Sequence, residues 1–153
     1  MSSREQRHAT CVALDGRGVL ILGRSGSGKS DLALRLLMQG AALVADDRVD
    51  LRFEGGAVVA SPPPSLAGLI EIRGVGIVAA ADIRAVAAAE CVICLVVELV
   101  APEHVPRLPP QARCDLLGVS LPVLRLAPFE SSAADKLRAA THLAAGDKPA
   151  RSG

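Results

Sequence analysis

The stretch Val19-Leu-Ile-Leu-Gly-Arg-Ser-Gly-Ser-Gly-Lys-Ser-Asp31 decides the fold of this chain. Four apolar residues lead into eight that match the phosphate-binding pattern G-x-x-x-x-G-K-[ST]. Leu32, Leu36 and Leu37 follow at the spacing of one helix face. The sequence therefore predicts a strand, a phosphate-binding loop (P-loop, residues 23–30) and a helix in direct succession, which is the context that this motif requires.

The predicted P-loop has the chemistry of a nucleotide site. Its glycines let backbone N–H groups turn toward phosphate oxygens, and the helix N-terminus adds partial positive charge. Lys29 would reach the β- and γ-phosphates, and the Ser30 hydroxyl would hold Mg²⁺. We expect ATP to be bound by Gly23, Arg24, Ser25, Gly26, Ser27, Gly28, Lys29 and Ser30. The alternative is a Gly/Ser turn with an unrelated lysine.

Length and composition indicate one domain over residues 1–153, with an ordered core at about 8–146 and a loose tail at 147–153. The net charge is +1, and the chain has no Trp, no Tyr and two Phe. A nucleic-acid surface is not expected, because neither a basic field nor aromatic stacking platforms are available. No apolar stretch is long enough to cross a membrane, and the polar N-terminus lacks a signal core, so we expect a cytoplasmic protein.

Hydrophobic patterning along the rest of the chain predicts an α/β fold. Asp15–Gly18 and Glu54–Gly56 are typical of hairpin turns, and Gly40 is placed to end the P-loop helix. Asp82–Ala89 could form one or two helical turns, and the Pro-rich segment 101–114 reads as a loop. Further strands are predicted at about 11–14, 43–45, 50–53, 58–61, 69–73, 77–80, 91–100 and 121–126, and a second helix at about 131–145.

Four cysteines raise the question of a zinc or redox site. Cys91 and Cys94 form C-x-x-C inside an apolar run that reads as a buried strand. Residues three apart on a strand face opposite sides, so the two thiols should diverge. Cys11 and Cys114 stand alone in the sequence. We expect all four to act as small, mostly buried side chains.

A pair of acids follows the next apolar strand. Asp46 and Asp47 come directly after residues 43–45, sixteen residues beyond Ser30. P-loop enzymes need a strand-end carboxylate to hold Mg²⁺, and adjacent residues on a strand point different ways. One acid could serve the metal while the other accepts the proton of a substrate hydroxyl. The alternative is a solvated acidic turn beside Arg48.

Glu71 and Arg73 fall on one face of another predicted strand, just before Gly74. A carboxylate and a guanidinium there could hold metal and phosphate respectively. By themselves the two residues are more typical of a surface ion pair. His8 by itself is an ordinary polar residue before a strand.

Together these motifs resemble the catalytic domain of HPr kinase/phosphorylase. The order and spacing match over about residues 8–80, with weaker similarity to about Ala140. An Asp-Asp pair so soon after the P-loop, combined with the later Glu-Ile-Arg-Gly stretch, makes the resemblance specific. The stretches that carry it are His8, 19–30, 43–49 and 70–77.

The resemblance implies a fold and an activity. Members of this family have a P-loop core of the phosphoenolpyruvate carboxykinase-like type, with a mixed sheet and flanking helices, and are usually hexameric. They use ATP and Mg²⁺ to phosphorylate a serine of the phosphocarrier protein HPr. We therefore expect a homo-oligomeric serine protein kinase that acts on an HPr-type carrier.

The resemblance also implies residue roles. Asp47 would accept the proton, with Asp46 as its metal-side neighbour. The implied catalytic set is Asp47, Lys29, His8, Asp46 and Arg107, the last by a gapped match to a later arginine. The implied Mg²⁺ set is Ser30, Glu71 and Asp46.

Two departures from the family pattern stand out. Only seven residues precede His8, so the chain reads as a short form made of the catalytic domain alone. The family has a Pro-Val-basic-x-Gly-Arg loop used in dephosphorylation, whereas this chain has Pro122-Val-Leu-Arg-Leu-Ala127. We therefore expect a kinase with weak or no phosphorylase activity.

Two other functions remain open from the sequence. A small-molecule P-loop kinase would need a lid with basic residues, and no Arg-rich lid segment is apparent. A non-catalytic nucleotide sensor would be favoured by loss of Lys29, Ser30 or Asp47, and all three are present. A GTPase of the usual type is excluded, because its Asn-Lys-x-Asp motif cannot occur in a chain without Asn.

Overall fold

A tight hairpin at the centre of the sheet places the P-loop. In the computed structural model, which describes residues 3–108 and 111–146, strand β2 (Thr10–Leu14) pairs antiparallel with β3 (Arg17–Leu22). The two-residue turn at Asp15 and Gly16 has positive φ at both positions, 51° and 79°, as a hairpin turn of this kind requires. The hairpin predicted at Asp15–Gly18 is thus confirmed, and β3 runs directly into the P-loop.

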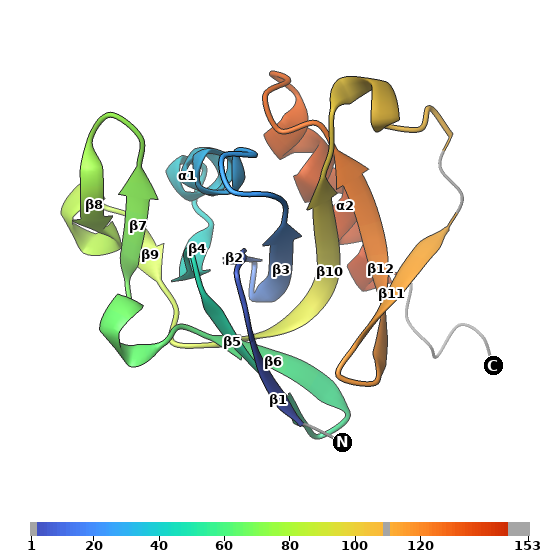
Figure 1. Ribbon diagram of the computed structural model, residues 1–153, viewed down its shortest axis with the longest axis horizontal. Coiled ribbons are helices and arrows are strands. Elements are labelled where there is room, and N and C mark those ends of the chain that lie inside the picture. Colours follow the sequence, from blue (N-terminus) through green and yellow to red (C-terminus); the bar gives the residue numbers. More distant parts are fainter. Residues whose placement is uncertain (1–2, 109–110, 147–153) are drawn as a thin grey trace.

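The strands form one curled, mixed sheet (Figure 1). β3 pairs in parallel with β10, and β10 in parallel with β12, while the β11–β12 hairpin closes one side. The main order is β1-β5-β6-β10-β3-β2-β4-β9. The remaining bounds are β1 (Arg4–Arg7), β4 (Ala42–Ala45), β5 (Val49–Glu54), β6 (Ala57–Ser61), β9 (Val86–Ala87), β10 (Cys91–Leu99), β11 (Ala112–Leu116) and β12 (Val119–Leu126).

Two α-helices and a separate hairpin complete the fold. Helix α1 (Lys29–Met38) follows the P-loop, and α2 (Ala133–Gly146) comes last. Strands β7 (Leu69–Ile72) and β8 (Gly76–Ala79) form a two-stranded sheet of their own, with β7 against α1 (Figure 1). Three short 3₁₀ segments are η1 (Pro64–Leu66), η2 (Ala80–Ile83) and η3 (Pro102–His104).

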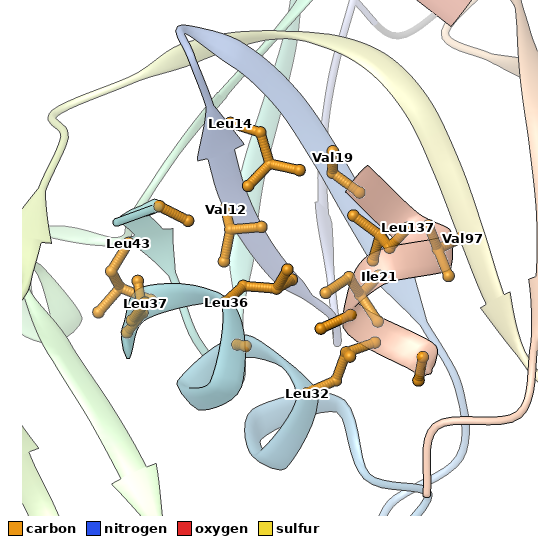
Figure 2. Close-up of a cluster of buried hydrophobic side chains, with 14 of the residues drawn as sticks. Val12, Leu14, Val19, Ile21, Leu32, Leu36, Leu37, Leu43, Val97 and Leu137 are labelled. Carbon is orange, nitrogen blue, oxygen red and sulfur yellow. The ribbon is translucent and has the colours of Figure 1, made fainter. Parts of the chain in front are cut away.

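Both α-helices cover the same face of the sheet. Leu32 and Leu36 of α1 and Leu137 of α2 are fully buried against it, together with Val12 and Ile21 from the central hairpin (Figure 2). These five belong to one cluster that also contains Leu14, Val19, Leu37, Leu43 and Val97. The helical face predicted from the leucine spacing is confirmed. Helix α1 ends at Met38 with Gln39 as its C-cap. Gly40 follows as the predicted left-handed residue, with φ 100°, and the Ala41 N–H donates to the Leu36 carbonyl.

The opposite face of the same strands has a second core. Cys11 and Leu20 alternate with the residues of the first cluster and pack with Val44 and Val58. A sheet buried on both faces explains why the strand before the P-loop is apolar at four successive positions.

All four cysteines are free. The Cys91 sulfur lies 3.6 Å from that of Cys11, whereas the Cys94 sulfur lies near the carbonyl of Val92. Burial and the hydrogen bond with Cys91 raise the pKa of Cys11 well above its usual value. The C-x-x-C pair therefore forms no two-thiol site, as its place on a strand predicts, but the contact of Cys11 with Cys91 was not foreseen.

Three regions of the chain differ from the sequence prediction. Strand β1 precedes His8 and pairs with β5, so regular structure begins before residue 8. Strand β11 lies in the segment predicted as a loop, and 3₁₀ segment η2 and β9 replace the helical turns expected at 82–89. Edge strands such as β1 and β11 are stabilised by backbone pairing with a neighbour, which leaves little hydrophobic pattern to detect. The predicted tail at 147–153 lies outside the described residues.

Among the described residues, no helix is both long and apolar enough to span a membrane.

The buried face of α1 allows a test of the packing. We expect Leu36→Ala to lower the free energy of unfolding by about 2–5 kcal/mol, because it leaves a cavity in the core between the helices and the sheet, the helix-side core. Met38→Ala in the same helix should change it by less than about 0.5 kcal/mol, because Met38 is 57% exposed. Urea titrations followed by circular dichroism measure both values, and equal losses in the two variants would contradict this packing.

Candidate active site

The P-loop turns back on itself between β3 and α1. The Ser27 N–H donates to the Arg24 carbonyl at 3.0 Å, and Gly28 caps the helix with φ 103°. Gly23 is required by close approach, because a Cβ there would lie 2.4 Å from the Ser27 hydroxyl oxygen. The buried Ser27 hydroxyl has no hydrogen-bond partner among the described residues. The loop thus brings N–H groups and a spare donor to the start of α1, the arrangement that holds phosphate.

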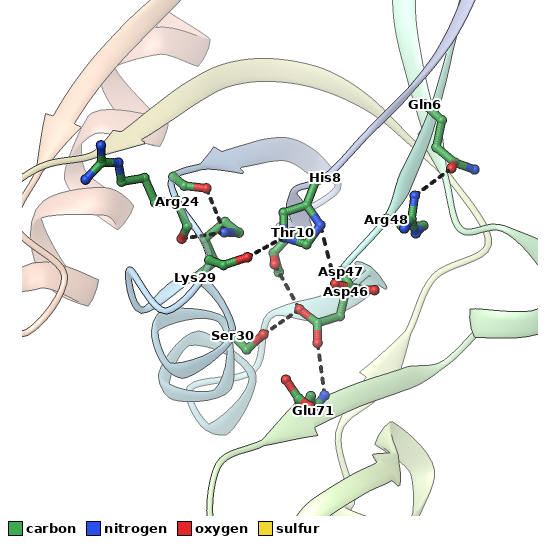
Figure 3. A network of polar contacts seen from close by, with 12 residues as sticks. Gln6, His8, Thr10, Arg24, Lys29, Ser30, Asp46, Asp47, Arg48 and Glu71 are labelled. Atoms are coloured by element: carbon green, nitrogen blue, oxygen red, sulfur yellow. Dashed lines mark hydrogen bonds and ion pairs between the residues drawn. The ribbon is translucent and has the colours of Figure 1, made fainter.

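Lys29 lies against its own loop. Its ammonium group donates to the carbonyl oxygens of Gly23 at 2.7 Å and Arg24 at 2.9 Å (Figure 3). Burial lowers the pKa of Lys29, while the negative charges of Asp46 and Asp47 oppose that shift. The side chain is placed as a fixed cation beside the loop and contributes nothing to the apolar core.

Asp46 is the centre of a buried hydrogen-bond network (Figure 3). Its Oδ1 accepts from the Thr10 hydroxyl at 2.8 Å and from the Ser30 hydroxyl at 2.7 Å. Its Oδ2 accepts from the backbone N–H of Glu71 at 2.9 Å. Only 4% of Asp46 is exposed, so these donors supply the polar contacts that a buried carboxylate needs. The network fixes the carboxylate beside the hydroxyl predicted to hold Mg²⁺.

Asp47 faces the other way and is open to solvent. Its side chain is 58% exposed, and its Oδ1 lies 3.4 Å from His8 Nδ1. The other ring nitrogen of His8 lies 3.3 Å from the Ser25 hydroxyl, so the imidazole bridges Asp47 to the P-loop (Figure 3). Asp47 has φ 71°, in the left-handed region that Asp tolerates better than most residues. The two acids therefore diverge, as the strand-end prediction requires.

Glu71 and Arg73 come from the β7–β8 hairpin, and both are exposed. They line one cavity of about 410 Å³ together with His8 and Asp47. That volume lies in the range of small-molecule sites. The same cavity is lined by Ser25, Gly26, Gly28, Lys29, Ser30, Thr10, Asp31, Leu34, Asp46, Ile72 and Phe129. The hairpin thus brings the third predicted motif to the first two.

The donor set suits a magnesium ion bound together with phosphates. Mg²⁺ in phosphate sites is usually held by one or two carboxylates, water and the substrate itself. Asp46, Ser30 and Glu71 provide carboxylate and hydroxyl oxygens at one end of the cavity. In the described part of the chain, no group of three or more His, Cys, Asp or Glu residues is placed to hold a metal ion by itself. The residues present therefore fit an ion that keeps open positions for phosphate and water.

Arg107 is the one predicted catalytic residue that the structure does not bring to this cavity. It follows η3, on the far side of β10 from the P-loop strand, and lines a different cavity of about 580 Å³ with Arg113 and Arg125. That larger cavity lies between β12 and α2 and contains no P-loop residue. Within this chain, the gapped match that suggested Arg107 is not supported by its position.

Several residues that line the site were not predicted, and Thr10 and Phe129 are the two that matter most for its chemistry. Thr10 holds Asp46 from a neighbouring strand, a contact between residues far apart in the chain that no local motif marks. Phe129 lines the cavity from the segment before α2. The only signal for Phe129 in the sequence was the scarcity of large aromatic side chains, since the chain has two Phe, no Tyr and no Trp.

Comparisons with known proteins agree with this geometry. Residues 1–131 match the family model described as "HPr Serine kinase C-terminal domain". Among curated proteins, "HPr kinase/phosphorylase" of Clostridium botulinum is 44% identical over 71 residues, 46% of this chain and 23% of that protein. The protein of the same name from Lacticaseibacillus casei is 46% identical over 79 residues, 51% of this chain and 25% of that protein. The match thus spans about a quarter of these relatives.

A solved structure matches almost the whole chain. The "Hpr(Ser) kinase/phosphatase from Coxiella burnetii" superimposes with a TM-score of 0.79 at 27% identity. The match covers 97% of this chain and 99% of that one. The expected mixed α/β fold of this kinase type is therefore confirmed.

The Thr10–Asp46 hydrogen bond provides a test of the network. We expect Thr10→Val to raise the Mg²⁺ concentration needed for half-maximal ATP binding, because the carboxylate beside Ser30 loses one of its two side-chain donors. Thr141→Val is a matched control, since it removes a buried hydroxyl that bonds only within α2. Calorimetric titration at several Mg²⁺ concentrations measures the effect. An equal Mg²⁺ requirement in both variants would show that Thr10 does not position Asp46.

Proposed function

Since the chain belongs to the HPr Serine kinase C-terminal domain family, we propose that it transfers the γ-phosphoryl group of ATP to a serine of an HPr-type phosphocarrier protein. The observation that carries the proposal is the convergence of three groups on one cavity: the P-loop lysine, a buried Asp46 beside Ser30, and an exposed Asp47. A kinase needs its phosphates held, its metal held and its acceptor hydroxyl deprotonated, and these groups match the three requirements.

The P-loop would bind and orient the phosphates. Backbone N–H groups between Gly23 and Ser30, together with the N-terminus of α1, form the cradle. Lys29 already lies on the loop and provides the positive charge next to it. Phosphoryl transfer depends mostly on such positioning and charge stabilisation, because little covalent chemistry falls to the protein.

Asp46, Ser30 and Glu71 would hold Mg²⁺. When bound, the ion would supply positive charge to the phosphate oxygens. The chain's own contribution is rigidity: Thr10 and the Glu71 backbone fix the Asp46 carboxylate, and Asp46 in turn fixes the Ser30 hydroxyl.

Asp47 would accept the proton of the acceptor serine. It is exposed to the cavity, where a protein substrate can reach it, and no hydrogen bond from the described backbone occupies its carboxylate. His8 lies between Asp47 and Ser25, so its ring would orient the carboxylate relative to the P-loop. The exposure of Asp47 also favours a protein acceptor over a small molecule, which would need an enclosed pocket.

The family resemblance extends the proposal to assembly and location. We expect a homo-oligomer, with a hexamer as the state that the resemblance implies, and a cytoplasmic protein. A nucleotide sensor without activity stays the alternative, but Asp47 has no evident use in such a protein.

Phosphorylase activity is a weaker candidate, because the expected basic loop is replaced by a strand. Pro122 to Leu126 lie within β12, and Leu124 packs against the helix-side core. Ala127 is buried at the position expected for the final arginine. Arg125, the remaining cation of the stretch, pairs with Glu98 at 3.0 Å. Little positive charge is therefore left in this stretch to hold a second anion beside a phosphoserine.

The kinase proposal is tested by incubating the chain with labelled ATP, Mg²⁺ and an HPr-type carrier, and measuring phosphoserine. We expect Asp47→Asn to lower turnover about 10²–10⁴-fold with Mg·ATP binding largely intact, because only a general base is lost. Asp46→Asn should instead raise the Mg²⁺ requirement. Lys29→Ala is the negative control for phosphate binding. Identical behaviour of the two Asp variants would contradict the division of roles, and no phosphoserine from the wild type would refute the kinase.

The reverse reaction is tested separately. Phosphorylated carrier with excess inorganic phosphate should yield pyrophosphate much more slowly than the forward reaction proceeds, because β12 offers no free basic cluster. Glu98→Gln releases Arg125 from its ion pair and should not lower the forward rate. Wild-type pyrophosphate release as fast as kinase turnover would overturn the expectation.

A further inference from the structure

The P-loop cavity is lined by one phenylalanine ring, to which the proposed kinase reaction assigns no role. Phe129 is 72% exposed and belongs to neither hydrophobic core. It nevertheless lines the cavity with Gly28 and Lys29. Exposing a large apolar ring gives up the free energy that burial would provide, about 1.5–3 kcal/mol for a side chain of this kind. A ring kept exposed beside a ligand cavity calls for a ligand that covers it.

Phe129 touches the P-loop itself. A Cβ built on Gly28 would lie 2.9 Å from the tip of the ring, Cζ, so the ring edge rests where a side chain at position 28 would be. Gly28 directly precedes Lys29 and Ser30, which are expected to contact phosphate. The ring therefore begins where the phosphate cradle ends, while Phe129 as a whole stays largely exposed.

Arg35 holds the ring in place from the P-loop helix. Its guanidinium donates to the carbonyl of Pro128, and at 3.4 Å to the carbonyl of Glu130, the two residues on either side of Phe129. The same group pairs with Asp31 one turn earlier at 3.1 Å. The segment that carries the ring is thus fastened to α1, the helix that begins with the phosphate-binding lysine.

We propose that the Phe129 ring is the surface on which the base of the bound nucleotide stacks. This assignment rests on the proposed use of ATP. It adds a contact for the base, which is a part of ATP that the P-loop does not contact. A planar base has a π-face that suits an aromatic ring, and ribose joins it to the phosphates. Among the residues that the structure describes, no other Phe, Tyr or Trp lines the cavity. Its other ring is the imidazole of His8, which lies between Asp47 and Ser25, and its remaining apolar contacts come from Leu34 and Ile72.

Stacking on a single ring predicts weak selectivity between bases. Every base has a π-face, whereas a choice between adenine and guanine needs hydrogen bonds to the base edges. Phe129 has no polar atom with which to make them. Loss of the ring should therefore weaken binding of ATP and GTP alike.

Calorimetric titration with two ligands tests the assignment. Mg·ATP carries a base, while inorganic triphosphate with Mg²⁺ has the same phosphate chain without one. We expect Phe129→Ala to weaken ATP binding about tenfold and to leave triphosphate binding within about twofold of wild type. Phe129→Trp keeps an aromatic face and should retain ATP affinity. Phe53→Ala is the matched control, because Phe53 is 45% exposed on β5 and does not line the cavity.

Arg35 is tested as a positioning residue. Arg35→Met removes the guanidinium but keeps an apolar stem, and should weaken ATP without weakening triphosphate. In the double variant Arg35→Met/Phe129→Ala, the loss should be close to that of Phe129→Ala alone, since both changes remove the same contact. If the fold-losses of ATP affinity in the two single variants multiply in the double variant, Arg35 does not act through the ring.

The outcomes separate this assignment from the kinase proposal. If the wild type binds ATP and triphosphate but Phe129→Ala matches it for both, the base does not use this ring. The same conclusion follows if Phe129→Ala weakens both ligands equally, or raises only the KM for the carrier protein, in which case the ring contacts the carrier. A wild type that binds neither ligand overturns ATP use and this assignment together.

Discussion

The buried carboxylate of Asp46 is the constraint on which the site depends. A negative charge removed from water must be matched by donors, and here these come from β2, α1 and the β7–β8 hairpin. The same three elements also pack against one another through buried apolar side chains, and the carboxylate adds the polar contact that fixes the point where they meet. By satisfying one carboxylate they also fix the Ser30 hydroxyl, the P-loop helix and the Glu71 backbone relative to one another. The polar network thus holds the elements of the site together, as apolar packing holds together the elements of the two cores.

Asp46 is buried and Asp47 is exposed, although the two residues are adjacent in the chain. After β4, the chain turns through a left-handed residue at Asp47, so that one acid faces the interior and the next faces the cavity. Identical side chains therefore acquire different chemistry from their surroundings. His8, at the start of the central hairpin, connects the exposed acid to the P-loop and completes the set.

Local motifs explain how much of this could be predicted. The P-loop, its helix and the paired acids each depend on residues close in sequence, so the strand before Gly23, the leucine face of α1 and the divergence of Asp46 and Asp47 could all be anticipated. Thr10 and Phe129 reach the site through contacts between distant segments, for which a single sequence gives no signal. Strands β1 and β11 form by backbone pairing with a neighbouring strand of the same chain, β5 and β12 respectively. Arg107 stays a prediction, because it came from a gapped match in a Pro-rich segment and lines a different cavity from the P-loop residues.

The position of Lys29 has a consequence for the cost of holding a phosphate. Its ammonium group donates to two carbonyl oxygens of its own loop, which leaves one of its three N–H donors for a phosphate oxygen. A free lysine side chain gives up much rotamer entropy when it is ordered by a ligand. Because the loop carbonyls already order Lys29, little of that entropy remains to be lost when a phosphate binds.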